Sequence, residues 1–252
     1  MSNNAILWEN LAWPDIPRTL ACCAKSVLWP FGATEQHGPH LALGTDSFIA
    51  TAVCLRVSER TRVPVLPTFC IGMSAGHSKK WPGTLSLKPS TLALVVRETG
   101  EWLHAAGVRR LFLINSHVTN AAPLRCGLEE LRTAYSDLMV SLIHTPEISL
   151  RIREEFFADG LDWHANAAET SLILYLRPDG VFPDRIKDDP DRTNGMEFAH
   201  PVDRTSTNGV TGSPSLGTRE KGARLFEMMV ADLSDRVMRG CSEVPPLQSR
   251  PL

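Results

Sequence analysis

Four short segments are apolar along almost their whole length, and this feature restricts the fold more than any other. They are bounded by turn residues and lie at Ser26 to Pro30, Val63 to Pro67, Arg110 to Asn115 and Leu138 to Ile143. Runs without alternating polar positions are typical of strands that are buried on both faces, as in a parallel sheet with helices on each side. We therefore predict that these four segments are strands of one sheet.

Helical patterns lie between the predicted strands. Pro89 to Ala106 carries an apolar stripe that includes Trp102, with Gly107 placed as a stop. Three further segments show a similar pattern: Asp46 to about Glu59, Asn120 to about Thr133, and Arg219 to Met238, the last closed by Gly240. Strands that alternate with helices predict an α/β layered fold with a mostly parallel sheet.

Residues 1–252 are expected to form one domain, because no linker-like change in composition divides them. Lys and Arg total 26 against 28 Asp and Glu, without blocks of like charge, so nucleic acid and membranes are not expected partners. The absence of a signal-peptide pattern and of C-x-x-C pairs favours the cytoplasm. The segment from Leu176 to Gly217 is too long for an ordinary connection, so we expect it to cover a site or a subunit contact.

Polar residues gather where the predicted strands end, which is where open α/β sheets bind ligands. The stretch GATEQHGPHLALGTD, from Gly32 to Asp46, follows the first strand, and His117 follows the strand that ends at Asn115. A third segment, DWHANAAETS, contains His164 and Glu169 near an expected helix start. In an extended loop, residues two apart point the same way, so Glu35 and His37 are expected to converge.

Five of these side chains have the chemistry of a two-ion site. Imidazole and carboxylate groups bind Zn, Mn or Fe, and one carboxylate can bridge two ions. The five candidates are Glu35, His37, Asp46, His117 and Glu169.

Each candidate also has an ordinary structural interpretation. Asp46 could cap a helix, and Asn166 with Glu169 resembles a capping box. His117 could be a hydrogen-bonded core residue, and Glu35 with His37 could be a surface pair in a turn. We interpret the remaining histidines as structural: His40, His77, His104, His144 and His200. Spacing alone leaves both interpretations open.

Several motifs together resemble the creatininase family, the creatinine amidohydrolases and their relatives. EQHGPHLALGTD, NSHVTN, WPGTLSL, HANAAETS and GVTGSPSLGTREKG occur in the order expected of that family, from roughly Leu28 to the last predicted helix. The resemblance implies a three-layer αβα sandwich, two divalent ions per chain and a homo-oligomer, usually a hexamer. It also implies hydrolysis of a C–N amide bond in a small non-peptide substrate, such as a cyclic amide or a formamide.

Carried over residue by residue, the resemblance assigns roles to the candidates. Glu35 and His117 correspond to ligands of one ion, His37 and Glu169 to ligands of the other, and Asp46 to the bridge. His164 corresponds to the acid/base histidine, and Trp81 and Trp163 fall in segments that line the pocket. Water held between the ions is expected to act as hydroxide, while His164 protonates the leaving nitrogen.

Two departures from the family pattern bear on the substrate. Ser116 precedes His117 where relatives commonly have glycine, and Thr119 stands where creatininase has a glutamate. Gly76 precedes His77 where many relatives carry an acid. Thr119 cannot supply a carboxylate, which argues against creatinine as the substrate, and Gly76 indicates that the pocket lining differs as well. These differences leave open a deformylase, a peptidase of the mycofactocin-precursor type, and a metal-free or single-metal protein that acts as a binding or scaffold protein.

Overall fold

A three-stranded parallel sheet lies at the centre of the protein. The computed structural model describes residues 4–77 and 79–247. Strands β1 (Ser26–Phe31), β2 (Arg110–Asn115) and β3 (Met139–His144) lie side by side in that order. Their register aligns Phe31, Asn115 and His144, so the three carboxyl ends meet at one edge of the sheet.

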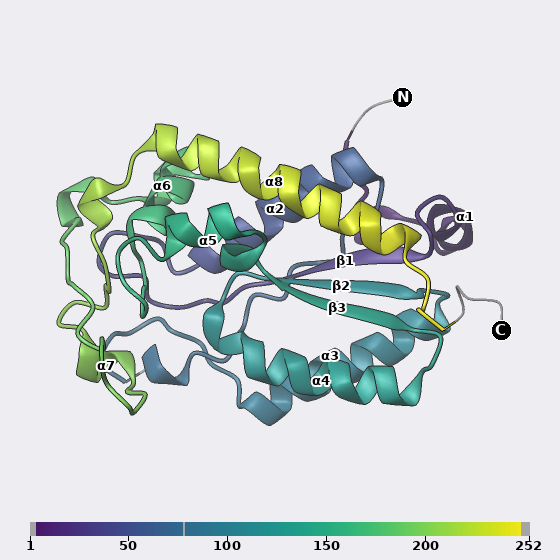
Figure 1. Ribbon diagram of the computed structural model, residues 1–252, viewed down its shortest axis with the longest axis horizontal. Helices are drawn as coiled ribbons and strands as arrows, with labels where there is room; N and C mark the ends of the chain where they lie inside the picture. The colour runs from purple at the N-terminus through teal and green to yellow at the C-terminus, as the bar shows by residue number, and fades with distance from the viewer. Residues whose placement is uncertain (1–3, 78, 248–252) are drawn as a thin grey trace.

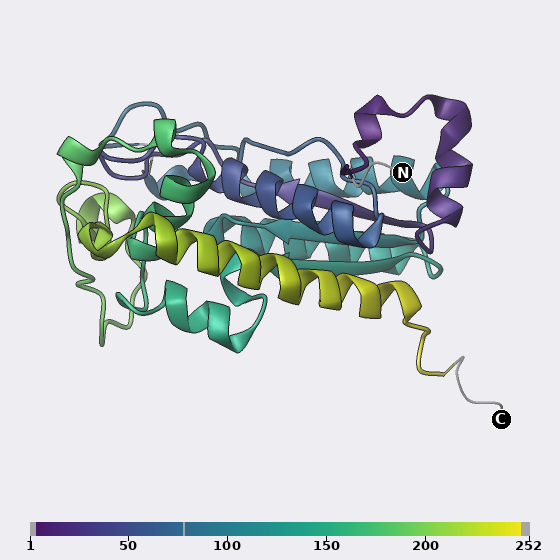
Figure 2. The same ribbon diagram turned by 90° about the horizontal axis from the view of Figure 1, so that it is seen from above.

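Helices cover both faces of this sheet (Figure 1). One face carries α2 (Thr45–Thr61), α5 (Leu150–Phe156), α6 (Ala167–Leu176) and α8 (Arg219–Ser242), and the other carries α3 (Pro89–Ala105) and α4 (Ala121–Ala134). Figure 2 shows α2 and α8 lying side by side. A separate cluster of buried apolar side chains fills each interface between sheet and helices. The predicted three-layer αβα architecture with a parallel sheet is therefore confirmed.

Shorter elements complete the described chain. These are α1 (Ile16–Ala21), α7 (Val202–Thr205) and the 3-10 helices Trp8–Asn10, Trp13–Asp15, Ala75–His77, Val118–Asn120, Thr145–Glu147, Pro178–Gly180, Pro183–Arg185 and Pro214–Leu216. Within residues 4–77 and 79–247, no helix combines the length and the apolar character that crossing a membrane requires.

The strand predicted at Val63 to Pro67 does not form. Val65 alone makes isolated parallel bridges, one of them with Leu28 of β1. Pro64 and Pro67 have no N–H to donate to a ladder, so the segment runs beside β1 without pairing continuously. Its apolar side chains are still buried, which explains why the sequence pattern resembles a strand.

Two helix details also differ from the prediction. Gly240 lies inside α8, which continues to Ser242, and does not end the helix. It is packed against Phe112, where a Cβ would lie 2.6 Å from the ring. Trp102 is 78% exposed instead of lying on the buried stripe of α3. Gly107 ends α3 as expected, with a φ of +100° that favours glycine.

The long segment after α6 lies at the end of the molecule opposite α1, where α7 is seen in Figure 1. Isolated bridges tie it to the rest of the structure, between Leu41 and Val181 and between His164 and Thr211, and a bridge between Asp189 and Gly212 joins two parts of the segment itself. His200, Val202, Thr205 and Thr211 from this segment line the cavity above the carboxyl ends of the strands. The expectation that it covers a site is therefore correct.

Candidate metal centre

Two glycines, Gly32 and Gly38, pack closely against neighbouring residues and shape the turn that follows β1. Gly32 packs against the start of α2, where a Cβ would lie 2.4 Å from the Ser47 nitrogen, and this contact brings Asp46 beside the turn. Gly38 has a φ of +62°, and a Cβ there would lie 2.4 Å from Val210. Only glycine fits both positions without a shift of the backbone. The sharp turn leaves Glu35 and His37 facing the interior.

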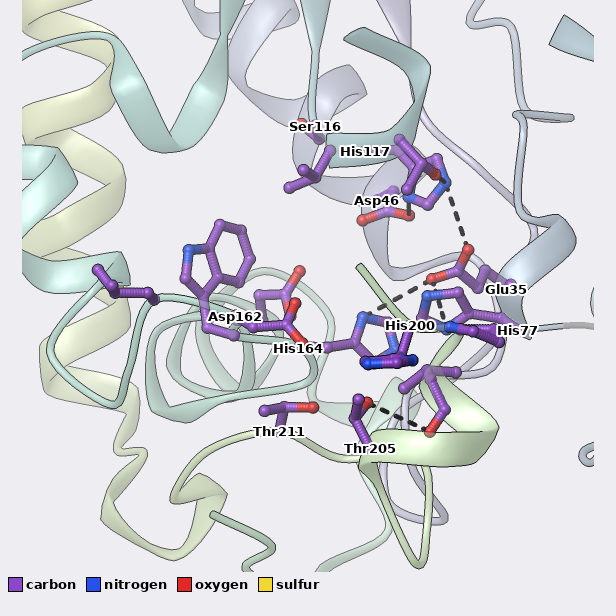
Figure 3. Close-up of a pocket in the computed structure, with 18 of the residues that line it drawn as sticks. Glu35, Asp46, His77, Ser116, His117, Asp162, His164, His200, Thr205 and Thr211 are labelled. Carbon is purple, nitrogen blue, oxygen red and sulfur yellow. Dashed lines mark hydrogen bonds and ion pairs between the residues drawn. The ribbon is translucent and has the colours of Figure 1, made fainter. Parts of the chain in front are cut away.

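The structure brings all five predicted ligands together in the interior, each no more than 5% exposed. Asp46 lies between two groups, since its Oδ1 is 3.3 Å from His37 Nε2 and its Oδ2 is 3.2 Å from His117 Nδ1. Glu35 Oε2 lies 3.3 Å from His117 Nε2, and Glu169 Oε1 lies 3.7 Å from His37 Nε2. Figure 3 shows Glu35, Asp46 and His117 converging in the pocket. Among the described residues, donor atoms within 4.8 Å of one another define three groups: Glu35, Asp46 and His117; His37, Asp46 and Glu169; and Glu35, His37 and His164.

Several buried oxygens in this cluster have no hydrogen bond. Within the described part of the chain, both carboxylate oxygens of Glu35 and Oδ2 of Asp46 accept none. A buried carboxylate without donors is strongly destabilising unless a cation compensates it. These atoms therefore fit a site that holds divalent ions.

The surrounding imidazoles present lone pairs to the carboxylates. His37 Nδ1 donates to the Glu35 carbonyl at 3.1 Å, which leaves Nε2 without a proton when the ring is neutral. His164 Nε2 donates to the Gln36 carbonyl at 2.8 Å, and His77 Nδ1 accepts from Gln36 Nε2 at 2.9 Å. Lone pairs and carboxylates that face each other repel unless a cation lies between them. A fixed tautomer of this kind is typical of metal-binding histidines.

Charge coupling in the cluster shifts the pKa values of its members. Burial raises the pKa of Glu35 to about 7 despite the nearby imidazoles. Burial lowers the pKa of His117, but Glu35 and Asp46 outweigh it and raise the pKa to about 9. Burial also lowers the pKa of His37, but the nearby carboxylates of Asp46 and Glu169 outweigh it and raise the pKa well above its usual value. The carboxylates thus attract positive charge, which protons supply in the absence of ions.

Hydrogen bonds at the helix starts decide between the structural and the functional interpretations of two residues. Asp46 makes no capping hydrogen bond, because α2 begins one residue earlier with Gly44 as N-cap, so the capping interpretation of Asp46 is wrong. Asn166 does cap α6, accepting from the Ala168 and Glu169 nitrogens. Glu169 Oε2 accepts from the Ala165 nitrogen at 2.6 Å, while Oε1 faces His37. Glu169 therefore serves the helix start and the cluster at once.

Thr119 contacts a predicted ligand without offering a carboxylate. Its hydroxyl donates to the Met73 carbonyl and lies 2.6 Å from His117 Nε2. His117 Nε2 is also 3.1 Å from both the Met73 carbonyl and the Ser74 hydroxyl. These polar neighbours surround Nε2, so His117 is oriented with Nδ1 toward Asp46.

A cavity of about 340 Å³ opens above the cluster. His164 lies at its wall, and its pKa is far below the usual value because of burial and the nearby His37 and His77. Trp163 lines the cavity as predicted. Among the described residues, Trp81 is outside the lining and packs against the Lys80 ammonium group instead.

Gly76, Ser116 and Thr119, the departures from the family pattern, line the cavity, and so do His77 and His200, which the sequence analysis interpreted as structural. The other cavity residues had no role in the sequence prediction: Val118, Phe157, Leu161, Asp162, Pro201, Val202, Thr205 and Thr211. Gln36 was also missed, although it contacts both His77 and His164. No spacing rule links residue 36 to residues 77 and 164, so only tertiary structure reveals these contacts.

Comparisons with known proteins agree with this geometry. The family model described as creatininase, creatinine amidohydrolase, matches residues 9–237. Creatinine amidohydrolase of Pseudomonas putida is 33% identical, over 98% of this chain and 100% of that protein. The mycofactocin precursor peptide peptidase of Mycolicibacterium smegmatis is 31% identical, over 94% of this chain and 96% of that protein. A solved creatininase structure described as the Mn form, 30% identical, superposes with a TM-score of 0.82 over 95% of this chain and 100% of that chain.

Proposed function

This chain belongs to the creatininase family, and we propose that it is an amidohydrolase that uses two divalent ions, Zn, Mn or Fe, to cleave a C–N amide bond of a small molecule. The observation that carries the proposal is the position of Asp46. Its carboxylate is shared between two groups of donor atoms, and its Oδ2 accepts no hydrogen bond within the described residues. Glu35 and His117 would hold one ion, and His37 and Glu169 the other.

Two divalent ions bound there would activate a water molecule and polarise the carbonyl oxygen of the substrate amide. His164 is suited to move the proton. Its Nε2 proton is held by the Gln36 carbonyl, so Nδ1 carries the lone pair on the side of Glu35, 3.6 Å from Oε1. A neutral imidazole has a lone pair at Nδ1 that can accept a proton, and because burial and the nearby imidazoles keep its pKa low, the protonated ring gives that proton up readily to the leaving nitrogen. An amide nitrogen leaves poorly without that proton.

A peptidase is the second candidate, favoured by the mycofactocin precursor peptidase among the relatives. The departure at Thr119 argues against creatinine as the substrate of either candidate, and Gly76 indicates a different pocket lining. Because a peptide and a lactam present the same amide to the centre, the shape of the cavity decides between them.

A substrate panel tests the proposal. Metal-reconstituted protein is incubated with lactams, formamides, cyclic ureas and short peptides, and products are identified by mass spectrometry. We expect hydrolysis within one class, and none by the Asp46→Asn variant. A protein that carries two ions but cleaves no amide would support the binding or scaffold role, and a protein without ions would refute the metal centre.

Assembly into a homo-oligomer, usually a hexamer in the family, is part of the proposal. Trp13 and Trp102 are 85% and 78% exposed, and large exposed aromatic side chains are common at subunit contacts. Light scattering of the purified protein measures the mass directly, and a monomer would contradict this part.

A further inference from the structure

A second cavity adjoins the metal centre and is not used by the proposed chemistry. It measures about 140 Å³ and shares Ser116, Val118, Phe157 and Trp163 with the larger cavity. We call it the side compartment. Its remaining lining comes from the end of the sheet, the start of α4 and the segment after β3: Asn115, Ala121, His144, Pro146 and Glu147.

The side compartment is apolar and carries little charge. Val118, Ala121, Pro146, Phe157 and Trp163 supply most of its lining. The charge of Glu147 is partly offset, because its carboxylate lies 3.8 Å from the Arg153 guanidinium.

The one imidazole in the lining is already engaged. His144 Nδ1 accepts a hydrogen bond from Asn115 Nδ2 at 3.0 Å. Burial lowers the pKa of His144, so the ring is neutral near pH 7. Among the described lining residues, the one charged side chain is Glu147, which is exposed, so a charged group in this compartment would find no buried partner there.

The volume sets the size of the occupant. An apolar cavity of about 150 Å³ holds one benzene molecule. A phenyl or branched aliphatic group of similar size fits the side compartment.

We propose that the side compartment binds an apolar arm of the substrate, of phenyl or isobutyl size, while the amide of the same molecule lies at the metal centre. The inference rests on the proposed function, because the arm is placed relative to an amide held at the centre. The four shared residues make the two cavities neighbours, and the proposal places one molecule across both. The substrate class is then an amide with an apolar substituent, which is larger than creatinine.

Hydroxamates test this inference without requiring turnover, since a hydroxamate chelates divalent ions through two oxygens. Isothermal titration compares acetohydroxamate with benzo-, phenylaceto- and 3-phenylpropionohydroxamate on metal-loaded protein. The best phenyl compound is expected to bind at least about tenfold more tightly than acetohydroxamate.

Two matched variants locate the effect. Ala121 lines the side compartment and not the larger cavity, whereas the next residue, Ala122, is exposed at the same helix start. Ala121→Leu is expected to remove the preference for the phenyl compound and to leave acetohydroxamate affinity unchanged. Ala122→Leu is expected to bind both compounds as the wild type does. Ala121→Val adds less volume, is easier to accommodate, and should give an intermediate preference.

The outcomes separate the two proposals. Equal affinity for acetohydroxamate and every phenyl compound, or an undiminished preference in folded Ala121→Leu and Ala121→Val, would overturn the side compartment alone. The side compartment would also be overturned if Ala122→Leu lost the preference for the phenyl compound. If acetohydroxamate does not bind to metal-loaded protein, the metal centre itself is refuted and the inference with it.

Discussion

Asp46 and Asp189 are both buried carboxylates, but their surroundings differ in kind. Asp189 receives hydrogen bonds from the Arg192 guanidinium, from the Ser206 hydroxyl at 2.9 Å and from the Thr207 nitrogen at 2.7 Å. Asp46 faces imidazole nitrogens, and its Oδ2 has no hydrogen bond among the described residues. Burial at Asp189 is thus compensated by donors with fixed protons, whereas burial at Asp46 is compensated only by His37 and His117, which keep the pKa of Asp46 well below its usual value when they carry protons.

The difference helps to separate a structural acid from one that holds a ligand. Asp189 anchors the segment that covers the cavity, because its partners Ser206 and Thr207 lie beyond α7. Burial raises the pKa of Asp189, but the hydrogen bonds from Arg192 and Thr207 outweigh it and leave the pKa well below its usual value. Replacement by asparagine should therefore lower mainly activity and metal content at Asp46, and mainly stability at Asp189.

Asp46→Asn is expected to have the largest effect on activity. An amide of the same shape lacks the charge and the second oxygen needed to bridge two ions, so kcat/KM should fall by about 10³-fold or more. Metal content should also fall, while the circular dichroism spectrum is kept. Activity close to that of the wild type would show that Asp46 is only a structural acid.

His164→Ala should lower kcat by about 10²- to 10⁴-fold, the usual contribution of a general acid or base. Both ions should remain, since Glu35, His37, Asp46, His117 and Glu169 are untouched. Plasma mass spectrometry of the dialysed variant measures them, with His104→Ala as the matched control outside both cavities. Loss of one ion would mean that His164 is a ligand instead.

Asp189→Asn should act on stability. Loss of charge-assisted hydrogen bonds to partly exposed partners costs about 1–3 kcal/mol of the free energy of unfolding. Urea denaturation measures this change, and metal content should equal that of the wild type. A variant of normal stability that binds less metal would reverse the roles given to the two carboxylates.

The smallest effect is the pH dependence of the Asp189 contribution. The pKa of Asp189 is depressed in the folded state, so its stabilisation is complete above the unfolded pKa of about 4 and is lost as the pH falls toward the folded value. The difference in unfolding free energy between wild type and Asp189→Asn should therefore be constant from pH 7 to 5 and shrink toward pH 3. A constant difference down to pH 3 would contradict this origin.

Periodicity predicted the layers but not the exact pairing. Apolar runs identified β1, β2 and β3 because strands buried on both faces lack polar positions. The run at Val63 to Pro67 is equally apolar, but its prolines prevent a ladder, and burial alone does not reveal pairing.

Part of the site was predicted because its residues are close in sequence. Glu35 and His37 lie two apart in one turn, Asp46, His117 and Glu169 were found from their positions at strand ends and helix starts, and the family resemblance then assigned the roles. Gln36, His77 and Asn115 were missed, because their roles come from hydrogen bonds that only the folded chain creates. Sequence patterns also did not predict the conformation of the segment around Asp189.

The most direct test of the metal centre is anomalous diffraction from crystals of the protein loaded with Mn or Zn. The account predicts two anomalous peaks, one on each side of the Asp46 carboxylate, with Glu35 and His117 at the first and His37 and Glu169 at the second. A single peak away from Asp46, or no peak within reach of these five side chains, would contradict it.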